Sequence, residues 1–479
     1  ASLVLPLRGG IATLGEYFAE VELGAPPQRV RLQVDSGSSS LVVTARECSS
    51  CSRGDALGGA YDAGASASAQ AVGCDSPRCG ANTCSSLSCR SDTCSLNAGA
   101  CCAASNNSVC GFFLRYGGDT DYHVAADGEL WLESIRVAGQ DFENVTVYRT
   151  LDEQGPWPSN VDGILGLGLP RLNCNPTCSE PVHEQMLAEL GGSRKFAMCL
   201  GDVSGALALG TDGAAEHLYV GRAYYVPILA ADLFGTYYTV GLEDMRVGSA
   251  TLLRTKGLPR QAIVDSGTTL LLLENDLWID LKAFFQTRFC RLAGVCTPKS
   301  IFEPGVCLVD KPRGFPVISL TLADGLRLEM PPSLYFIAYT DPNFGRQVYC
   351  FGIQPAGRER TVFGDTLLRG FTTVYDLEER RIGFAEPNRT TCGNLTESIG
   401  AIRIHHHWPF PFEGGNASLQ GFALAAGTVA IVTALLTQLL LCVRTTHTLR
   451  SPKYPKNVPV EGGLGASSRQ SEFGTFAYA

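Results

Sequence analysis

The tripeptide Asp-Ser-Gly occurs twice in this chain, at residues 35–37 and 265–267. Each copy follows a strand-like apolar run, residues 30–34 in the first half and 261–264 in the second, and each precedes further hydroxyl side chains. One such tripeptide is ordinary turn chemistry. Two copies in matching surroundings predict a duplicated unit that presents one carboxylate from each half of the chain.

Two further pairs of segments support the duplication. Residues 17–24 precede the first tripeptide and residues 237–248 precede the second, and both are rich in aromatic and β-branched residues and bounded by Gly. Downstream, Ile-Leu-Gly at 164–166 matches Val-Phe-Gly at 362–364. An internal repeat at half-length constrains the fold more than any single motif does.

With their flanking sequences, these elements resemble a pepsin-type aspartic protease. The resemblance extends from about residue 11 to residue 387 and includes Val-Asp-Gly-Ile-Leu-Gly-Leu-Gly at 161–168, Val-Phe-Gly-Asp-Thr-Leu-Leu-Arg-Gly-Phe at 362–371 and the ending at 374–385. The elements follow one another in the family's order. The resemblance implies an all-β fold with minor helices, in which an active-site cleft lies between two pseudo-symmetric lobes.

Composition agrees with a β-rich fold. The chain has 479 residues, of which 45% are hydrophobic and 18% charged, so it can bury a sizeable core. It contains 53 Gly and 25 Pro, and short alternating runs outnumber helical patterns. The best helical candidates are residues 181–190 and 274–289. We expect an N-terminal lobe over residues 1–200 and a C-terminal lobe over 201–388.

An uncharged apolar segment lies at residues 421–443. As a helix it would be about 34 Å long, enough to cross a hydrocarbon core of about 30 Å. A buried core helix is the alternative, but the segment lies beyond the protease-like region and has no polar face. Basic residues follow it and none lies at 413–420, which places the C-terminus in the cytosol. The sequence therefore predicts a stalk over 389–420, one transmembrane helix and a cytosolic tail over 444–479.

Charge and acceptor sites fit this orientation. The tail carries five basic and two acidic residues, a net +3, so the chain's −9 leaves about −12 before it. An acidic ectodomain argues against binding to nucleic acid. Acceptor sequences Asn-x-Ser/Thr all precede the apolar segment, and we expect glycosylation at Asn106, Asn144, Asn388, Asn394 and Asn416.

We therefore expect a monomeric, single-pass type I membrane protein of the secretory pathway, with its ectodomain lumenal or extracellular. The compartment could be the endoplasmic reticulum, the Golgi, an endolysosome or vacuole, or the cell surface. The chain begins at Ala1 without an initiator Met. We expect that a signal peptide, and with it a pro-segment, has been removed.

Cysteines concentrate in an insertion-like stretch at residues 48–110. Ten of the 19 cysteines lie in it, and 18 precede the apolar segment, so an oxidising compartment predicts up to nine disulfides of unassigned pairing. A zinc site at Cys48 and Cys51 would need a reducing compartment and a second matched pair. A Cys-rich insertion at this place resembles the nepenthesin-like branch of the pepsin-type proteases.

Paired aspartates fit the hydrolysis of a peptide bond. Two carboxylates about 3 Å apart cannot both ionise, so one stays protonated while the other is charged. The charged carboxylate takes a proton from the attacking water, and the other carboxyl donates to the carbonyl oxygen. We predict that Asp35 and Asp265 act as this pair without a cofactor or metal, and that they titrate as a unit.

Residues next to the aspartates have expected roles. Gly37 and Gly267 allow a sharp turn and a close approach of the backbone. The resemblance implies that the hydroxyls at positions 38 and 268 bind the outer carboxylate oxygens and that those at 36 and 266 exchange hydrogen bonds across the pair. Taken singly, each hydroxyl could be a simple turn cap. The four residues are Ser36, Ser38, Ser266 and Thr268.

A hairpin over about residues 112–124 is the candidate flap that covers the cleft. It has aromatic strand residues followed by a Gly-Gly turn, and the resemblance implies that Tyr116 and Gly117 face the substrate. The alternative is an ordinary surface hairpin. The family often has a Trp soon after the first Asp that binds the flap Tyr, whereas this chain has Val42 and Val43. The flap of this chain must therefore be held in place by residues other than the family's Trp.

The sequence as a whole predicts an aspartic endopeptidase that acts on peptide or protein substrates. A catalytically inactive relative that binds proteins through the same cleft is the alternative. Such relatives generally lose one Asp or distort its motif, and both motifs are intact here. A Cys-rich adhesion receptor would leave the paired motifs unexplained.

Overall fold

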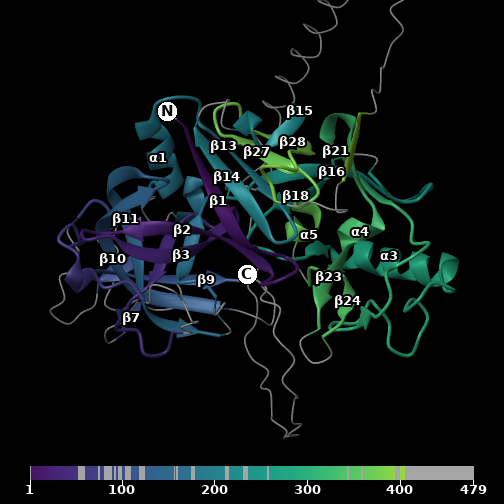
Figure 1. The fold of residues 1–479 in the computed structure, drawn as a ribbon, viewed down its shortest axis with the longest axis horizontal. Coiled ribbons are helices and arrows are strands. Elements are labelled where there is room, and N and C mark those ends of the chain that lie inside the picture. Colours follow the sequence, from purple (N-terminus) through teal and green to yellow (C-terminus); the bar gives the residue numbers. More distant parts are fainter. Residues whose placement is uncertain are drawn as a thin grey trace, which may run out of the picture. The chain divides into compact units, whose positions relative to one another are not determined.

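Strands dominate the folded chain and helices are few (Figure 1). The predicted class, all-β with minor helices, is confirmed for the part of the chain that the structure describes. The computed structural model describes residues 2–404, with gaps at residues 52–59, 74–75, 80–88, 91–92, 95–99, 103–108, 118–123, 156, 158–159, 174–178, 211–214, 230–235, 256–257, 342–344, 358–359 and 394–399.

Both helices expected from the sequence are present. Helix α1 spans Val182–Leu190 and helix α3 spans Asn275–Arg288, each within one residue of its predicted bounds. Each buries an apolar stripe against the sheets, as an amphipathic surface helix does. The single-turn helices α4 (Pro332–Tyr335) and α5 (Asp365–Leu368) were not predicted, because four residues carry no helical period.

Most strands of the first half belong to one large sheet. Its order is β15-β28-β27-β13-β14-β1-β2-β3-β12-β4-β11-β10-β9-β8, with β5 beside β10. The strands up to residue 210 are β1 (Ser2–Gly10), β2 (Glu16–Leu23), β3 (Gln28–Asp35), β4 (Leu41–Thr44), β5 (Gln70–Ala71), β6 (Cys89–Arg90), β7 (Thr93–Cys94), β8 (Ala100–Cys102), β9 (Cys110–Tyr116), β10 (Val124–Val137), β11 (Gln140–Gln154), β12 (Gly163–Gly166), β13 (Lys195–Leu200) and β14 (Ser204–Gly210).

The second half contributes strands to this sheet and builds a second sheet, in the order β25-β19-β26-β18-β16-β21-β22-β29 with β17 beside β16. The strands after residue 210 are β15 (Tyr219–Pro227), β16 (Thr239–Val247), β17 (Ala250–Arg254), β18 (Arg260–Val264), β19 (Leu271–Leu273), β20 (Cys307–Leu308), β21 (Ile318–Leu322), β22 (Leu326–Met330), β23 (Phe336–Thr340), β24 (Gln347–Phe351), β25 (Ile353–Pro355), β26 (Thr361–Phe363), β27 (Thr372–Asp376), β28 (Arg381–Pro387) and β29 (Ala401–Ile404).

A three-strand arrangement is repeated in the two halves. In the first half β3 pairs in parallel with β12, and β12 pairs antiparallel with β4. In the second half β18 pairs in parallel with β26, and β26 pairs antiparallel with β19. The predicted equivalence of residues 164–166 and 362–364 is therefore confirmed, since β12 and β26 occupy the same place in the two units.

Aromatic side chains from the two halves meet in one continuous core. Phe196 of the first half stacks on Tyr375 of the second, with ring centroids 4.3 Å apart, and Tyr238 meets Tyr375 edge-on at 4.8 Å. All three side chains are buried. Because β14 pairs with both β1 and β13, the large sheet also continues across residue 200, where the sequence placed the boundary between lobes.

Part of the segment expected to be a stalk is folded onto the protein. Cys392 forms a disulfide with Cys199, and strand β29 pairs antiparallel with β22. Ile402 of β29 packs against the main hydrophobic core. The folded region thus extends past residue 388, because an alternating Ala-Ile-Arg-Ile run can complete a sheet edge.

Five disulfides join cysteines among the described residues: Cys48–Cys51, Cys79–Cys110, Cys199–Cys392, Cys290–Cys296 and Cys307–Cys350. The zinc alternative for Cys48 and Cys51 is wrong, because their sulfurs are bonded to each other. No helix within the described ranges is both long and apolar enough to cross a membrane. The predicted span at 421–443 and the tail at 444–479 lie outside those ranges.

Candidate active site

Equivalent places in the two units carry Asp35 and Asp265. Asp35 is the last residue of β3 and pairs with Gly166 of β12. Asp265 directly follows β18, and its backbone N–H donates to the carbonyl of Phe363 on β26 at 3.1 Å. The repeated strand arrangement therefore delivers both carboxyl groups to one place, from strands that are 230 residues apart in sequence.

Ser36 and Ser266 lock the two units together. The N–H of Ser36 donates to Ser266 Oγ at 3.1 Å, and the N–H of Ser266 donates to Ser36 Oγ at 3.0 Å. Each hydroxyl then donates to a strand carbonyl of the other unit, Ser36 Oγ to Val264 at 3.1 Å and Ser266 Oγ to Val34 at 2.8 Å. All donors and acceptors in this exchange are buried, so the exchange fixes the strand ends that carry the aspartates.

Backbone amides hold the inner oxygens of the two carboxyl groups. Gly37 N–H donates to Asp35 Oδ1 at 2.7 Å, and Gly267 N–H donates to Asp265 Oδ1 at 2.8 Å. Each glycine also faces the opposite aspartate. A methyl group on Gly37 would lie 2.5 Å from Asp265 Oδ1, and one on Gly267 would lie 2.3 Å from Asp35 Oδ1. Only glycine fits at these two positions.

The hydroxyls at positions 38 and 268 were expected to bind the two carboxyl groups in the same way, but their hydrogen bonds differ. Thr268 Oγ1 donates to Asp265 Oδ2 at 2.7 Å. Ser38 Oγ lies beside Asp35 and lowers the pKa of that carboxyl, but it does not make the well-formed hydrogen bond that Thr268 makes. The two carboxyl groups are therefore not equivalent.

The pKa of Asp35 is raised above its ordinary value near 4. Burial raises it most, and the neighbouring Asp265 raises it further through its charge and through a hydrogen bond between the two side chains. Ser38 and the N–H of Gly37 oppose the shift. The pair thus favours a state with one shared proton, which two carboxyl groups in contact require.

A pocket opens over the two aspartates. Apolar side chains from both halves line it together with Asp35 and Asp265, and the candidate flap contributes Leu114, Tyr116 and Gly117. The other apolar lining residues are Leu172, Ile263, Leu272 and Val362. Such a site can admit an extended chain with apolar side chains and bring one of its peptide bonds to the carboxyl pair.

Strands β9 and β10 form the hairpin expected at about residues 112–124. They pair antiparallel from Gly111–Glu129 to Tyr116–Val124, and residues 118–123 at the tip lie outside the described ranges. Tyr116 Oη is buried without a hydrogen-bond partner in the described part of the chain. Its ring instead meets Trp157 edge-on, with ring centroids 5.5 Å apart. Sequence analysis missed Trp157, because no motif marks it.

Two of the five predicted glycosylation sites fall on described residues. Asn144 is exposed in strand β11 with a φ of 57°. Asn388 is half-buried, and its side-chain amide donates to the carbonyl of His217 at 3.0 Å. The other three sites, Asn106, Asn394 and Asn416, lie outside the described ranges. Glycosylation stays a prediction for all five.

Comparison with known proteins agrees with this geometry. A model of the eukaryotic aspartyl protease family matches residues 16–387. The chain belongs to the eukaryotic aspartyl protease family. Aspartic proteinase 39 of Arabidopsis thaliana is 27% identical over 420 residues, which cover 84% of this chain and 81% of the relative. Gastricsin of Homo sapiens is 29% identical over 385 residues, 77% of this chain and 81% of the relative. The predicted resemblance to pepsin-type aspartic proteases is confirmed.

Two further carboxyl groups of this chain are buried, and one of them lies near the pair. Glu16 at the start of β2 is 3% exposed, and neither of its carboxyl oxygens meets a hydrogen-bond partner among the described residues. Asp365 at the start of α5 is equally unsatisfied, and burial and the charge of Asp265 raise its pKa. Sequence analysis missed both as titratable groups, because burial is set by the fold.

Replacing Glu16 with Gln should flatten the fall in stability between pH 4.5 and 7. Burial raises the pKa of Glu16 from 4.5 to about 7, against the opposing charge of Arg31. The folded state therefore holds a proton that the unfolded state releases, and the free energy of unfolding should drop by about 3 kcal/mol as the pH rises through this range. Urea unfolding of wild type and variant at several pH values measures the difference.

Glu20→Gln is the matched control, because Glu20 is an exposed residue of the same strand. It should leave the pH dependence of unfolding unchanged. A Glu16→Gln variant whose stability falls as steeply as that of the wild type would show that Glu16 ionises normally in the folded protein.

Proposed function

We propose that this protein is an aspartic endopeptidase in which Asp35 and Asp265 activate one water molecule between them. The observation that carries the proposal is the reciprocal hydrogen bonding of Ser36 and Ser266, which brings the two carboxyl groups together from opposite halves of the chain. Membership of the aspartyl protease family supports the same activity.

The reaction needs one ionised and one protonated carboxyl. The ionised group takes a proton from water as the oxygen attacks the peptide carbonyl, while the protonated group donates to the carbonyl oxygen. Collapse of the tetrahedral intermediate returns a proton to the leaving amine and restores the shared proton. Burial and the charge of Asp265 raise the pKa of Asp35, which favours a pair that keeps one proton before attack. The pair titrates as one unit, so activity should decline as the pH rises through its upper pKa.

Peptide or protein substrates are implied by the family. The lining of the pocket, with Leu114, Leu172 and Leu272 around the carboxyl pair, favours apolar side chains beside the scissile bond. Burying an apolar side chain in such a pocket contributes roughly 1.5–3 kcal/mol to binding.

Incubation of the purified full chain with a mixture of unstructured peptides at pH values from 3 to 7 tests the proposal. Mass spectrometry of the products should show internal cleavages with apolar residues flanking the cut, and a pepstatin-type inhibitor should suppress them. Absence of cleavage at every pH would favour the alternative, an inactive protein that binds partners through the same cleft.

We also propose that the enzyme is anchored as a type I membrane protein of the secretory pathway. The uncharged segment at 421–443 and the basic residues after it support this topology. The disulfides among the described residues, including the one that joins Cys199 to Cys392, fit an oxidising compartment. Carbonate extraction of membranes combined with protease protection would test the anchor and its orientation.

A further inference from the structure

The candidate flap, strands β9 and β10, packs against Trp157, a residue that no sequence motif marks. Tyr116 is the last residue of β9, at the described end of the flap, and lines the pocket over Asp35 and Asp265. The position at which the family often has a tryptophan after the first Asp is held here by valine. Val42 packs with Phe112 and Tyr148 in a small apolar cluster beneath the flap. Unlike a tryptophan indole, the valine side chain has no N–H that could donate to the tyrosine hydroxyl.

Trp157 reaches this cluster from a different part of the chain. Strand β11 ends at Gln154, which pairs with Ala125 of the flap strand β10. The backbone N–H of Trp157 donates to the carbonyl of Gly155 at 3.1 Å. The Trp157 indole packs against the same apolar cluster as Tyr116.

The indole contacts both strands of the flap. Its ring meets the Tyr116 ring on β9 with centroids 5.5 Å apart and an interplanar angle of 77°. Its Nε1–H donates to the carbonyl of Ala125 on β10 at 3.1 Å. Edge-to-face aromatic pairs at this separation are attractive, and the hydrogen bond fixes the orientation of the indole. A single side chain therefore ties the two flap strands together.

The Tyr116 hydroxyl receives no hydrogen bond from Trp157. The indole N–H of Trp157 donates to Ala125, and Tyr116 Oη meets no hydrogen-bond partner among the described residues although it is buried. A buried hydroxyl without a partner is costly, and that cost falls when a ligand supplies one. No described residue therefore competes with a polar group of the substrate backbone for this hydroxyl.

We propose that Trp157 is the positioning residue of the flap, which holds the Tyr116 ring over the carboxyl pair and leaves the Tyr116 hydroxyl for the substrate. The proposal rests on the proposed peptidase function for its kinetic consequences only. Trp157 acts through Tyr116 and does not touch the reacting atoms. The position of the flap itself can be measured without catalysis.

Kinetics of four variants of the full chain test the proposal. Trp157→Ala should lower kcat/KM for an extended peptide about three- to tenfold, while the pH profile set by the aspartates stays unchanged. Trp157→Phe keeps a ring edge against Tyr116 and should recover part of the loss. In a Tyr116→Leu background, Trp157→Ala should cost little more, because the two side chains act as one unit.

Hydrogen exchange supplies the readout that does not need activity. In Trp157→Ala, the amides of residues 112–116 and 124–127 should exchange several-fold faster than in the wild type, with other protected amides unchanged. Trp131→Ala is the matched control: Trp131 is also partly buried on β10, and its indole donates to Glu129 at 3.1 Å, away from Tyr116. It should leave the exchange of residues 112–116 unchanged.

Two results would overturn the proposal. The first is that the flap amides of Trp157→Ala exchange hydrogen as slowly as those of the wild type. The second is that Trp157→Ala lowers kcat/KM by the same factor in the wild-type and in the Tyr116→Leu background. A wild-type protein that cleaves no peptide would refute the peptidase function alone. The exchange comparison would still decide whether Trp157 orders the flap.

Discussion

Asp35→Asn and Asp265→Asn should each lower kcat for peptide hydrolysis by at least about 10²–10⁴-fold. An amide matches a carboxyl in shape and can still accept the backbone N–H bonds from Gly37 or Gly267. It cannot ionise, so it neither takes the proton of water nor shares one with the other carboxyl. Steady-state kinetics on a peptide found in the cleavage screen, with thermal unfolding of each variant, measures the effect.

The single variants are compared with the double variant and with a control at another buried aspartate. The double variant should be no less active than either single variant, because groups that act as a unit lose their effect together. Asp244→Asn is the control, since Asp244 is also buried but lies on β16 away from the pocket. Near-normal hydrolysis by either single variant, with the fold intact, would end the assignment of the pair.

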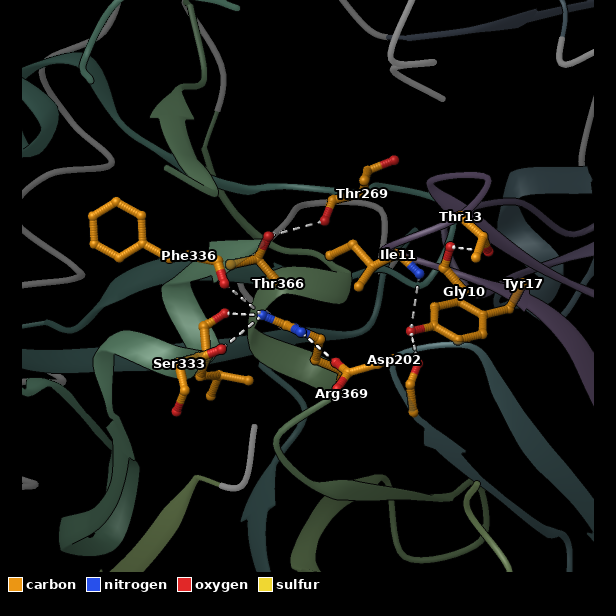
Figure 2. A network of polar contacts seen from close by, with 12 residues as sticks. Gly10, Ile11, Thr13, Tyr17, Asp202, Thr269, Ser333, Phe336, Thr366 and Arg369 are labelled. Carbon is orange, nitrogen blue, oxygen red and sulfur yellow. Dashed lines mark hydrogen bonds and ion pairs between the residues drawn. The ribbon is translucent and has the colours of Figure 1, made fainter. Parts of the chain in front are cut away.

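Arg369→Leu should lower the free energy of unfolding by about 3–5 kcal/mol. The Arg369 side chain is 2% exposed, and its guanidinium lies at the centre of the polar network in Figure 2. Nη1 donates to Asp202 Oδ1 at 2.5 Å, and Nη2 donates to the carbonyls of Ser333 at 3.1 Å and Phe336 at 3.3 Å. Leucine would leave an uncompensated carboxylate and buried carbonyls.

The hydrogen-bond network of Arg369 is also connected to the candidate active site. Arg369 directly follows helix α5, and α5 follows β26, the strand whose Phe363 carbonyl accepts the N–H of Asp265. We therefore expect residual folded Arg369→Leu to be less active as well as less stable. Arg369→Lys should recover part of the stability, because an ammonium keeps the charge but lacks the forked donors that reach several carbonyls.

Arg136→Leu serves as the control for Arg369→Leu. Arg136 pairs with Asp141 at 2.6 Å, but their side chains are 44% and 52% exposed. Water and salt screen such a pair, so its loss should lower the free energy of unfolding far less than the loss of Arg369. Urea denaturation of the three variants measures the difference. Equal effects of Arg369→Leu and Arg136→Leu would show that burial adds nothing to the Arg369 network.

Much of the fold could be predicted because the chain is duplicated. Each half repeats a strand, an Asp-Ser-Gly turn and a later apolar-Gly strand, and the structure pairs these elements in the same way in both halves. The two longer helices were also predictable, since nine and fourteen residues are enough to show a helical period. The boundary after residue 388 was predicted less well, because Ala401–Ile404 completes a sheet whose edge is visible only in the fold.

Some contacts of the candidate active site could likewise be predicted from the sequence, and others could not. The exchange between Ser36 and Ser266, inside the repeated motif, was expected from the family resemblance, and the structure contains it. Ser38 and Thr268 are equivalent in sequence but not in hydrogen bonding. Equivalent positions in a duplicated sequence therefore do not guarantee equivalent hydrogen bonds in the folded site.

The sequence by itself determined the all-β class and the duplication, and it singled out Asp35 and Asp265 as the candidate pair, because these follow from local patterns that recur along the chain. Only the tertiary structure decided which residues support them. Trp157 lies 41 residues from Tyr116 in sequence and Arg369 lies 167 residues from Asp202, yet each pair is in contact. Such contacts depend on how strands and turns far apart in sequence pack together, and no local pattern records that packing.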